Sequence, residues 1–586
     1  MLFFYDVNYY FIDLEVENNS TFLKGSTLIK AKTEKKLHTF LIELSMDFRV
    51  DSVFIDKKKQ NFIHRNKEIS IFLDDFLKKN VHFEVKIFYH GMAKGEGIRS
   101  KKNIVWTLSE SFHSIDWFPC KQILSDKADS VSVHITTDKK NKVASNGLLK
   151  KIVNLENNKV CFQWKSCYPI AYYLISFNLG EYIEYNFYAY PKDKDSIFIQ
   201  NFVPDSFFLE RNLKKIHQTK DLIELFSELY GTYPFEKEKY GQCFSHISGG
   251  MENQTMTTLN NFDFTLVAHE LSHQWFGNNV TCASWNDIWI NEGFATYSEY
   301  IALQFLKNEK EAKKWLEEAN YFAYMNDFGT VYIPENELNE NRIFSFPLTY
   351  QKGALILHMI RFELGNDNLF FEIMRDFQKK FKNNVASASD FLKILEEKSK
   401  KKFSVFFNNW YYKSSYPVFN AKWYQDKNNF YLTIEQNSSN GNELLFNNSV
   451  EYRLNFLEKD TILKIKMNKK IENLIFNLEE EVISIEIDPN NWILNDVSRI
   501  TKENYTAEFL DFEFKPNPFK NKLEIIFNKK NIQTHIYLTD INGRKIIEKK
   551  TEKKEIILNT ENLKSGIYFI KVVSKKKEIV KKVVKL

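Results

Sequence analysis

The sequence has few cysteines and no long apolar run, and each absence excludes a class of protein. Its 586 residues include five cysteines, too few for a disulfide framework, and none forms the C-x-x-C pair of thiolate metal sites and redox motifs. One disulfide is compatible with this number, and at least one thiol stays free. No stretch of 18 or more apolar residues occurs, so we expect no transmembrane helix. A hydrophobic fraction of 43%, with 16% aromatic residues, excludes disordered and collagen-like chains.

A strong excess of charge of one sign is also missing. The chain has 81 Lys+Arg and 76 Asp+Glu, a formal net charge of +5, which gives little support to nucleic-acid binding. Residues 501–586 hold 20 Lys+Arg against 11 Asp+Glu, a net charge of +9, which leaves −4 for residues 1–500. The basic excess therefore belongs to the C-terminal tail.

The first two hundred residues are predicted to form antiparallel β-structure. Over residues 81–89, apolar residues alternate with His82, Glu84 and Lys86, which is the period-two pattern of a half-buried strand. Residues 12–16 and 131–135 repeat this pattern. At roughly 100–200 residues per domain, the length of the chain predicts about three to five domains in all.

Helical spacing dominates the middle of the chain. Leu222, Leu225, Phe226 and Leu229 lie on one helical face, and further helices are predicted near 264–276, 289–306, 309–323, 350–364, 367–382 and 388–400. Strands return after Tyr416. The predicted division is a β-domain at 1–198, a mostly helical domain at 199–415, a β-sandwich at 416–502 and a small C-terminal β-sandwich at 513–586. The fold class is multidomain α+β.

The segment from His269 to His273 has the pattern H-E-x-x-H. On a helix, positions i and i+4 share a face, so both imidazoles can bind the same metal ion, and Glu270 can act as general base toward a water molecule on that ion. Two surface histidines on an amphipathic helix are the alternative that this motif alone leaves open.

A second segment favours the metal site. Eighteen residues separate His273 from Glu292, which begins the run Glu292-Gly-Phe-Ala-Thr-Tyr-Ser-Glu299. Two imidazoles and one carboxylate leave the fourth position of a tetrahedral zinc ion open, as in catalytic rather than structural sites. Such an ion lowers the pKa of its water to about 7 and polarises a carbonyl group. The sequence therefore predicts a hydrolase site with one Zn²⁺ per chain.

Four ordered motifs resemble those of the aminopeptidase N-like gluzincins, a family that includes leukotriene hydrolase. Besides H-E-x-x-H and N-E-G-F-A, Gly249-Gly250-Met251-Glu252-Asn253 is similar to the family's G-[AG]-M-E-N motif, and Tyr350-Gln-Lys352-Gly353 is similar to its Y-x-K-G segment. The resemblance covers roughly residues 1–500. It implies a thermolysin-like catalytic domain at 199–415, His269, His273 and Glu292 as zinc ligands, and Glu270 as the base.

The resemblance also implies roles in binding the substrate. Tyr350 would stabilise the tetrahedral intermediate, and Glu252 would bind the α-ammonium group of a peptide with a free N-terminus. Gly249, Gly250, Met251 and Asn253 would line the substrate site, where the glycine backbone can pair with an extended peptide.

Two further carboxylates are weaker candidates. Glu110 occupies the place of a second residue that binds the amine, but the family's A-R-x-x-[FL]-P-C run is replaced here by Ser114-Ile-Asp-Trp117 ahead of Phe118-Pro-Cys120. Glu299 matches an acidic residue that can orient a metal ligand through a hydrogen bond. The alternatives are an exposed loop carboxylate for Glu110 and a solvated helix face for Glu299.

The tail resembles the C-terminal sorting domain of proteins exported by the type-nine secretion system of Bacteroidetes. It contains Lys515-Pro-Asn-Pro-Phe519, Asp540-Ile-Asn-Gly543 and Leu563-Lys-Ser-Gly566, and it ends in the run from Lys581 to Leu586. The resemblance implies that the secretion machinery is a partner and that the protein is secreted or at the cell surface. A small β-sandwich acting as a binding module is the alternative. The N-terminus shows no signal peptide, so a truncated start, or a periplasmic or cytoplasmic location, stays open.

The expected function is a zinc-dependent aminopeptidase that releases N-terminal residues by attack of metal-activated water on the first peptide bond. The rivals are an epoxide hydrolase or bifunctional enzyme like leukotriene hydrolase, and an inactive surface protein that binds peptides. The family's large C-terminal helical domain is expected to be absent, because a single β-domain and the tail follow residue 415.

Overall fold

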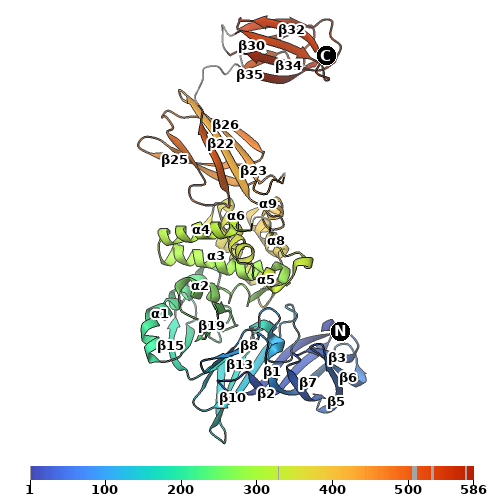
Figure 1. The fold of residues 1–586 in the computed structure, drawn as a ribbon, viewed down its shortest axis with the longest axis vertical. Coiled ribbons are helices and arrows are strands. Elements are labelled where there is room, and N and C mark those ends of the chain that lie inside the picture. Colours follow the sequence, from blue (N-terminus) through green and yellow to red (C-terminus); the bar gives the residue numbers. More distant parts are fainter. Residues whose placement is uncertain (1, 327–328, 443, 504–510, 529–532, 575–576) are drawn as a thin grey trace. The chain divides into compact units, whose positions relative to one another are not determined.

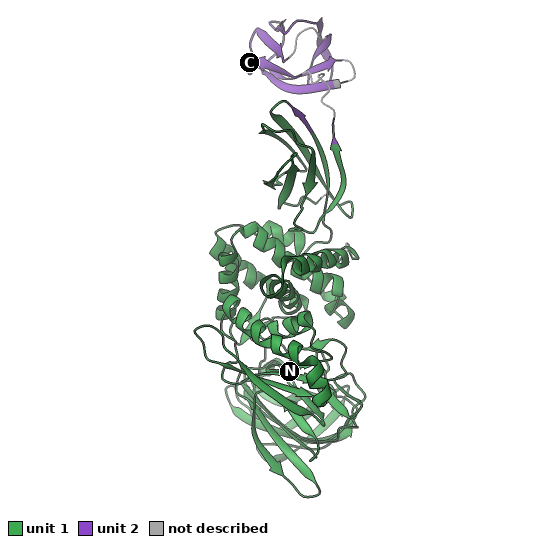
Figure 2. Ribbon diagram, turned by 90° about the vertical axis from the view of Figure 1, so that its left-hand side faces the viewer, with its two compact units in different colours: residues 1–423, 427–501 green, residues 424–426, 502–586 purple. Residues whose placement is uncertain are grey.

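The computed structural model describes residues 2–326, 329–442, 444–503, 511–528, 533–574 and 577–586. It divides into two compact units, one of residues 1–423 and 427–501 and a second of residues 424–426 and 502–586 (Figure 2). The predicted fold class is confirmed, since β-sheets at the N-terminus, a helical middle and β-rich C-terminal parts follow one another along the chain (Figure 1). The four-part division at the bounds given above stays a prediction.

A ten-stranded sheet forms most of the N-terminal part. Its order is β12-β13-β10-β1-β2-β7-β4-β5-β6-β3. The strands are β1 (Tyr5–Val16), β2 (Phe22–Thr33), β3 (Leu37–Glu43), β4 (Phe48–Ile55), β5 (Lys58–Arg65), β6 (Glu68–Leu77), β7 (His82–Met92), β10 (Ser130–Asp138), β12 (Leu148–Asn154) and β13 (Lys159–Ser166). In β7, Phe83, Val85, Ile87 and Tyr89 are buried as their alternation predicted.

The sheet differs from the prediction in one pairing. Its strand pairs are antiparallel except β1 with β10, which run parallel, with Ile12 opposite Val133. A parallel pair needs a long connection, and here six other strands of this sheet lie between the two partners in the sequence. A smaller sheet has the order β11-β14-β9-β8; its strands are β8 (Ile98–Lys101), β9 (Ile104–Thr107), β11 (Lys142–Ser145) and β14 (Phe177–Gly180).

A five-stranded sheet leads into the helical part. Its order is β15-β16-β17-β19-β18, with parallel pairs β16–β17 and β17–β19 and an antiparallel pair β18–β19. The strands are β15 (Ile183–Ala189), β16 (Ile197–Val203), β17 (Tyr240–Phe244), β18 (Gly250–Met251) and β19 (Met256–Leu259). The two-residue strand β18 is the edge of this sheet. The segment 249–253, which resembles the G-[AG]-M-E-N motif, therefore lies along that open edge.

The helices follow the predicted spacing closely. They are α1 (Ser206–Leu229), α2 (Phe264–Ser272), α3 (Trp289–Leu306), α4 (Glu309–Tyr324), α5 (Glu340–Ile343), α6 (Gly353–Leu364), α7 (Asp367–Lys380), α8 (Ala388–Ser399) and α9 (Ser404–Trp410), beside the short parallel strands β20 (Val280–Cys282) and β21 (Asn384–Ala386). Ser387 and Asp390 form the capping box at the start of α8. The helix predicted over 350–364 starts earlier, as a π-helix at Phe346–Lys352, and continues as α6.

β-structure returns beyond the helices. One sheet, β26-β23-β22-β28, and a second, β25-β24-β27, contain β22 (Pro417–Asp426), β23 (Asn429–Ser438), β24 (Ser449–Asn455), β25 (Asp460–Lys466), β26 (Ile471–Asn477), β27 (Ser484–Ile487) and β28 (Asp496–Lys502). All five cysteines carry free thiols, and none of the described helices is long and apolar enough to cross a membrane.

The C-terminal unit has a core of its own. Its two sheets, β29-β30-β33 and β32-β31-β34-β35, contain β29 (Phe512–Lys515), β30 (Lys522–Phe527), β31 (Thr534–Thr539), β32 (Lys545–Thr551), β33 (Glu555–Asn559), β34 (Gly566–Ser574) and β35 (Lys577–Lys585). Phe519, Leu523, Ile525 and Ile570 are buried between them. A turn at Asn542-Gly543 joins the antiparallel strands β31 and β32, and the tail is the small β-sandwich that its sequence indicated.

Candidate active site

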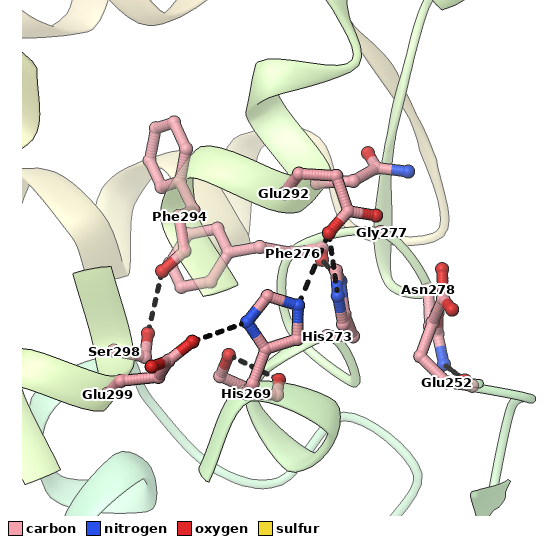
Figure 3. Close-up of polar contacts among 12 residues, drawn as sticks. Glu252, His269, His273, Phe276, Gly277, Asn278, Glu292, Phe294, Ser298 and Glu299 are labelled. Atoms are coloured by element: carbon pink, nitrogen blue, oxygen red, sulfur yellow. Dashed lines mark hydrogen bonds and ion pairs between the residues drawn. The ribbon is translucent and has the colours of Figure 1, made fainter. Parts of the chain in front are cut away.

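The two histidines of H-E-x-x-H lie at the C-terminal end of α2 and face Glu292 on α3. The Nε2 atoms of His269 and His273 are 3.2 Å and 3.4 Å from Glu292 Oε2 (Figure 3). One donor atom from each of the three residues lies within 4.8 Å of the others. Only 12% of the His269 side chain is exposed, and 2% and 3% of His273 and Glu292. The three side chains could hold one metal ion in a nearly dry site.

Hydrogen bonds orient both imidazoles. His273 Nδ1 donates to the backbone carbonyl of Phe276 at 2.9 Å, and His269 Nδ1 donates to Glu299 Oε1 at 2.9 Å (Figure 3). Trp315 Nε1 in turn donates to Glu299 Oε2 at 3.0 Å. With Nδ1 of each ring bound to an acceptor, Nε2 of each ring faces Glu292 and is the nitrogen that would bind a metal ion once it has lost its proton.

The residues fit a divalent cation. Two neutral imidazoles and one carboxylate are the donor set of zinc sites with an open position. The charges agree: burial works against the anionic form of Glu292, but His273 and His269 outweigh it and lower its pKa to about 2. Burial works against the cationic form of His273, yet the Glu292 and Glu252 carboxylates raise its pKa to about 9. The pocket therefore favours positive charge among its carboxylates.

Glu270 and Glu252 lie beside these ligands. One ligand atom each from Glu252, Glu270 and His273 falls within 4.8 Å of the others, and the same holds for Glu110, Glu252 and Glu292. Glu110 Oε1, Glu252 Oε1 and Glu270 Oε2 are buried without a hydrogen-bond partner among the described residues. Burial raises the pKa of all three carboxyl groups, that of Glu270 to about 8. Unpartnered carboxylates in such a site are binding groups for a cation or for protons of a substrate.

Glycine at position 250 lets the edge strand approach the base. Gly250 lies in β18, and a Cβ added there would collide with the carboxylate of Glu270. Gly249 has φ of +78°, which glycine adopts without cost. Met251 is buried, and Asn253 Nδ2 donates to Thr258 Oγ1 at 3.1 Å across the turn to β19. The backbone of Gly250 thus borders the carboxylate of Glu270 directly.

Tyr350 reaches the site from the π-helix. Its ring stacks on that of His269 with the centroids 6.0 Å apart. Burial and the surrounding carboxylates raise its pKa well above the ordinary value, so the phenol keeps its proton. Next to the π-helix, Gly293 on α3 and Gly353 at the start of α6 let these two helices pack closely, because a Cβ on Gly293 would lie 3.1 Å from the carbonyl carbon of Gly353.

Comparison with known proteins places this site in a family. Residues 6–174 match the Peptidase M1 N-terminal domain, and residues 214–410 match the Peptidase family M1 domain. The chain carries both domains of the M1 peptidase family. Residues 514–586 match the Secretion system C-terminal sorting domain, which bears out the resemblance of the tail.

Curated relatives of this M1 chain are aminopeptidases by name. "Probable aminopeptidase 2" of Sulfurisphaera tokodaii is 26% identical over 515 residues, which span 82% of this chain and 58% of that protein. "Endoplasmic reticulum aminopeptidase 1" of Mus musculus is 28% identical over 284 residues, which span 45% of this chain and 30% of that one. The M1 chain therefore spans less than two thirds of the length of either relative.

Solved structures share the fold of this M1 chain. A mutant M1 zinc metallopeptidase from Deinococcus radiodurans, bound to a Tyr-Ser-Ala substrate, aligns with a TM-score of 0.60 at 20% identity. The alignment covers 68% of this chain and 92% of that one. A second structure, of an M1 zinc metallopeptidase from Deinococcus radiodurans, aligns with a TM-score of 0.58 at 21% identity, and the alignment covers 67% of this chain and 90% of that one.

Several contacts at the M1 site were not predicted from the sequence. Gln274 and Asn278 follow His273 closely, and their side-chain amides donate to the backbone carbonyl of Glu252 at 3.3 Å and 2.7 Å. Trp315, on the next helix, holds Glu299. The sequence contains these amide and indole groups. It does not show which backbone carbonyl the amides bind, or that Trp315 of α4 lies beside Glu299 of α3.

Replacing Glu299 by alanine is expected to weaken zinc binding about 10- to 100-fold, because His269 would lose the partner that fixes its tautomer and ring orientation. Zinc affinity is measured by competition with a chromophoric chelator. Glu317→Ala, a carboxylate removed from the neighbouring helix α4, is the control. An unchanged affinity in Glu299→Ala would assign Glu299 to the solvated helix face instead.

Proposed function

We propose that this chain is a zinc aminopeptidase that binds one Zn²⁺ through His269, His273 and Glu292 and removes N-terminal residues from peptides. The observation that carries the proposal is a pair of carboxylates, Glu110 and Glu252, beside three candidate metal ligands; one buried oxygen of each has no hydrogen-bond partner in the part of the chain that the structure describes. A metal triad alone suits many hydrolases. Added carboxylates within 4.8 Å of Glu292 provide a place for an ammonium group at a fixed distance from the metal.

Glu252 and Glu110 accept the protons of the substrate's α-ammonium group. Such charge-assisted bonds are stronger than neutral ones, and the buried setting strengthens them further. They set the register of cleavage, because only the first peptide bond then falls beside Glu270. The peptide extends along the open edge of β18, where the backbone of Gly249, Gly250 and Met251 pairs with it as a neighbouring strand would.

Zinc, when bound, supplies a Lewis acid that polarises the scissile carbonyl group and lowers the pKa of a water ligand to about 7. Glu270 takes the proton of the attacking water at its carboxylate and passes it to the nitrogen of the leaving amine. Tyr350 donates its phenol proton to the carbonyl oxygen, a hydrogen bond that strengthens as negative charge develops there. Asn253 and Glu299 support the site through hydrogen bonds, Asn253 to Thr258 and Glu299 to His269.

A panel of aminoacyl fluorophores, with and without a chelator, tests the proposal. The full chain is expected to release the fluorophore, to lose activity in the chelator and to regain it with Zn²⁺, while N-acetylated analogues stay intact. Bound zinc without turnover of any aminoacyl group would favour an inactive peptide-binding protein. Opening of an epoxide substrate, assayed in parallel, would favour the epoxide hydrolase or bifunctional alternative.

We further propose that the C-terminal unit directs export by its secretion machinery, so that the enzyme acts outside the cell or at its surface. The match of residues 514–586 to a sorting domain supports this, together with the separate core of that unit. Cell fractionation of a producing strain tests it, and retention of the intact chain in the cytoplasm would contradict it.

A further inference from the structure

The segment Glu252–Thr255, which follows the edge strand β18, is held firmly on the side of the zinc ligands. Asn278 Nδ2 and Gln274 Nε2 both donate to the backbone carbonyl of Glu252. The backbone N–H of Thr255 donates to Gln274 Oε1 at 3.0 Å. Two side chains that follow His273 closely thus fix both ends of the segment, which ties the position of Glu252 to that of the metal ligands. Figure 3 shows the bond from Asn278 to Glu252.

The other side of the segment is held by the N-terminal β-structure. Asn146 lies in the bend between β11 and β12 and is 1% exposed. Its Nδ2 donates to the backbone carbonyls of Gln254 at 2.7 Å and Leu174 at 2.9 Å, and its Oδ1 accepts the N–H of Ser176 at 2.7 Å. One amide therefore joins the segment to the chain on either side of Ile175.

Neighbours of Asn146 reinforce this contact. The N–H of Gly147 donates to Thr255 Oγ1 at 2.7 Å, and Lys239 Nζ donates to the carbonyls of Ser145 and Thr255, each at 3.0 Å. Gly147 has φ of +73°, and a Cβ there would collide with the carbonyl oxygen of Lys165. The bend at 146–147 is thereby fitted closely between β13 and the segment.

Thr255 needs such support. Its φ is +61°, a left-handed conformation that is rare for a β-branched residue and persists only where surrounding contacts hold it. Contacts from Gly147, Lys239 and Gln274 hold it, together with the backbone N–H of Gly241, which donates to the Thr255 carbonyl at 2.9 Å. If the hydrogen bonds on one side of the segment were lost, the backbone at Thr255 would relax. The carboxylate of Glu252, three residues away, would then move relative to His273.

We propose that Asn146 is a positioning residue for the α-ammonium site: from the N-terminal β-structure it holds Glu252 at the distance from the metal ligands that suits an N-terminal residue. This inference rests on the proposed aminopeptidase function. Asn146 contacts the backbone of residue 254, not the substrate, and its effect is confined to amine recognition. The N-terminal β-structure thus takes part in setting where a peptide is cut.

The test is Asn146→Ala in the full chain, compared with Asn141→Ala. Asn141 is equally buried, and its Nδ2 donates to Thr137 Oγ1 at 2.9 Å across the turn between β10 and β11, so Asn141→Ala removes a buried amide nearby in the sequence without touching the contact with Gln254. In Asn146→Ala, KM for leucyl and alanyl fluorophores is expected to rise about tenfold, which is the effect of losing the one buried hydrogen bond that reaches the segment, from Asn146 to Gln254. The change in kcat is expected to be less than about threefold.

Two inhibitors separate amine recognition from metal binding. The Ki of leucine hydroxamate, which carries an α-amine, is expected to rise in Asn146→Ala by the same factor as KM. The Ki of acetohydroxamate, which lacks the amine, is expected to stay unchanged. Zinc content stays at the wild-type level, and Asn141→Ala leaves KM and both Ki values as in wild type.

Other outcomes overturn the inference. Unchanged KM and Ki in folded Asn146→Ala, or equal losses with both inhibitors, would leave Asn146 a merely structural residue. If Asn146→Ala does not fold, Asn146→Asp keeps the shape and the acceptor for Ser176, and an unchanged KM in that variant overturns the inference as well. A wild-type chain that turns over no aminoacyl substrate refutes the proposed function instead, so the two failures are distinguishable.

Discussion

Replacing Glu270 by glutamine is expected to lower kcat about 10²- to 10⁴-fold while zinc stays bound, because glutamine keeps the shape of the side chain but takes no proton. Glu270 is not one of the three proposed zinc ligands, so replacing its carboxylate leaves those ligands in place. Its carboxylate lies against Gly250 on the edge strand, where the scissile bond of a peptide paired with β18 would fall. Turnover of a leucyl fluorophore and zinc content by mass spectrometry measure the two quantities.

The raised pKa of Glu270 agrees with a role in proton transfer. Burial raises it to about 8, while His269 and His273 lower it in part. A carboxylate with a pKa near neutrality can both accept the proton of water and return it to the leaving amine. The same charge loss elsewhere serves as control: Glu363→Gln removes the carboxylate that accepts from Ser449 at the end of α6, far from the ligands in the sequence. If Glu270→Gln kept more than about a tenth of the wild-type kcat, another group would be the base.

The three proposed zinc ligands could be brought together from the sequence because their geometry is local. Helix α2 places His269 and His273 one turn apart, and helix α3 begins at Trp289 as the apolar pattern indicated, so Glu292 enters at the first turn. Helical periodicity and the short connection between the two helices are enough to bring such residues together. The predicted helix nevertheless continued to residue 276, whereas α2 ends at Ser272 and the chain turns back at Gly277, with φ of +126°.

The rest of the site depends on pairings that no periodicity shows. Glu110 and Glu252 meet because a loop before β10 and the edge of the five-stranded sheet come together, and parallel pairs such as β16–β17 join strands distant in the sequence. Tyr350 stands on a π-helix where the apolar spacing predicted an α-helix. Asn146 binds a backbone carbonyl, and since every residue has one, the sequence does not mark which is used.

Replacing Glu252 by glutamine is expected to raise KM for free-amine substrates about 10- to 100-fold, with a smaller change in kcat. The variant keeps the size of the side chain and removes the charge that holds the ammonium group, and a hydrogen bond to a charged group contributes about 1.5–3 kcal/mol. Its backbone carbonyl still accepts from Gln274 and Asn278, so the segment stays in place. Steady-state kinetics on leucyl fluorophores and the Ki of leucine hydroxamate measure the effect.

Glu110→Gln separates the roles of the two carboxylates. If both bind the same ammonium group, each single variant raises KM, and the double variant falls short of the product of the two effects, because residues that share one partner are not independent. If Glu110 is only a loop carboxylate, Glu110→Gln leaves KM unchanged and the double variant equals Glu252→Gln. Acetohydroxamate is the control for both, since it lacks the amine. A KM for leucyl substrate that stays at the wild-type value in Glu252→Gln would remove the ammonium site from this position, and with it the reason for cleavage at the first bond.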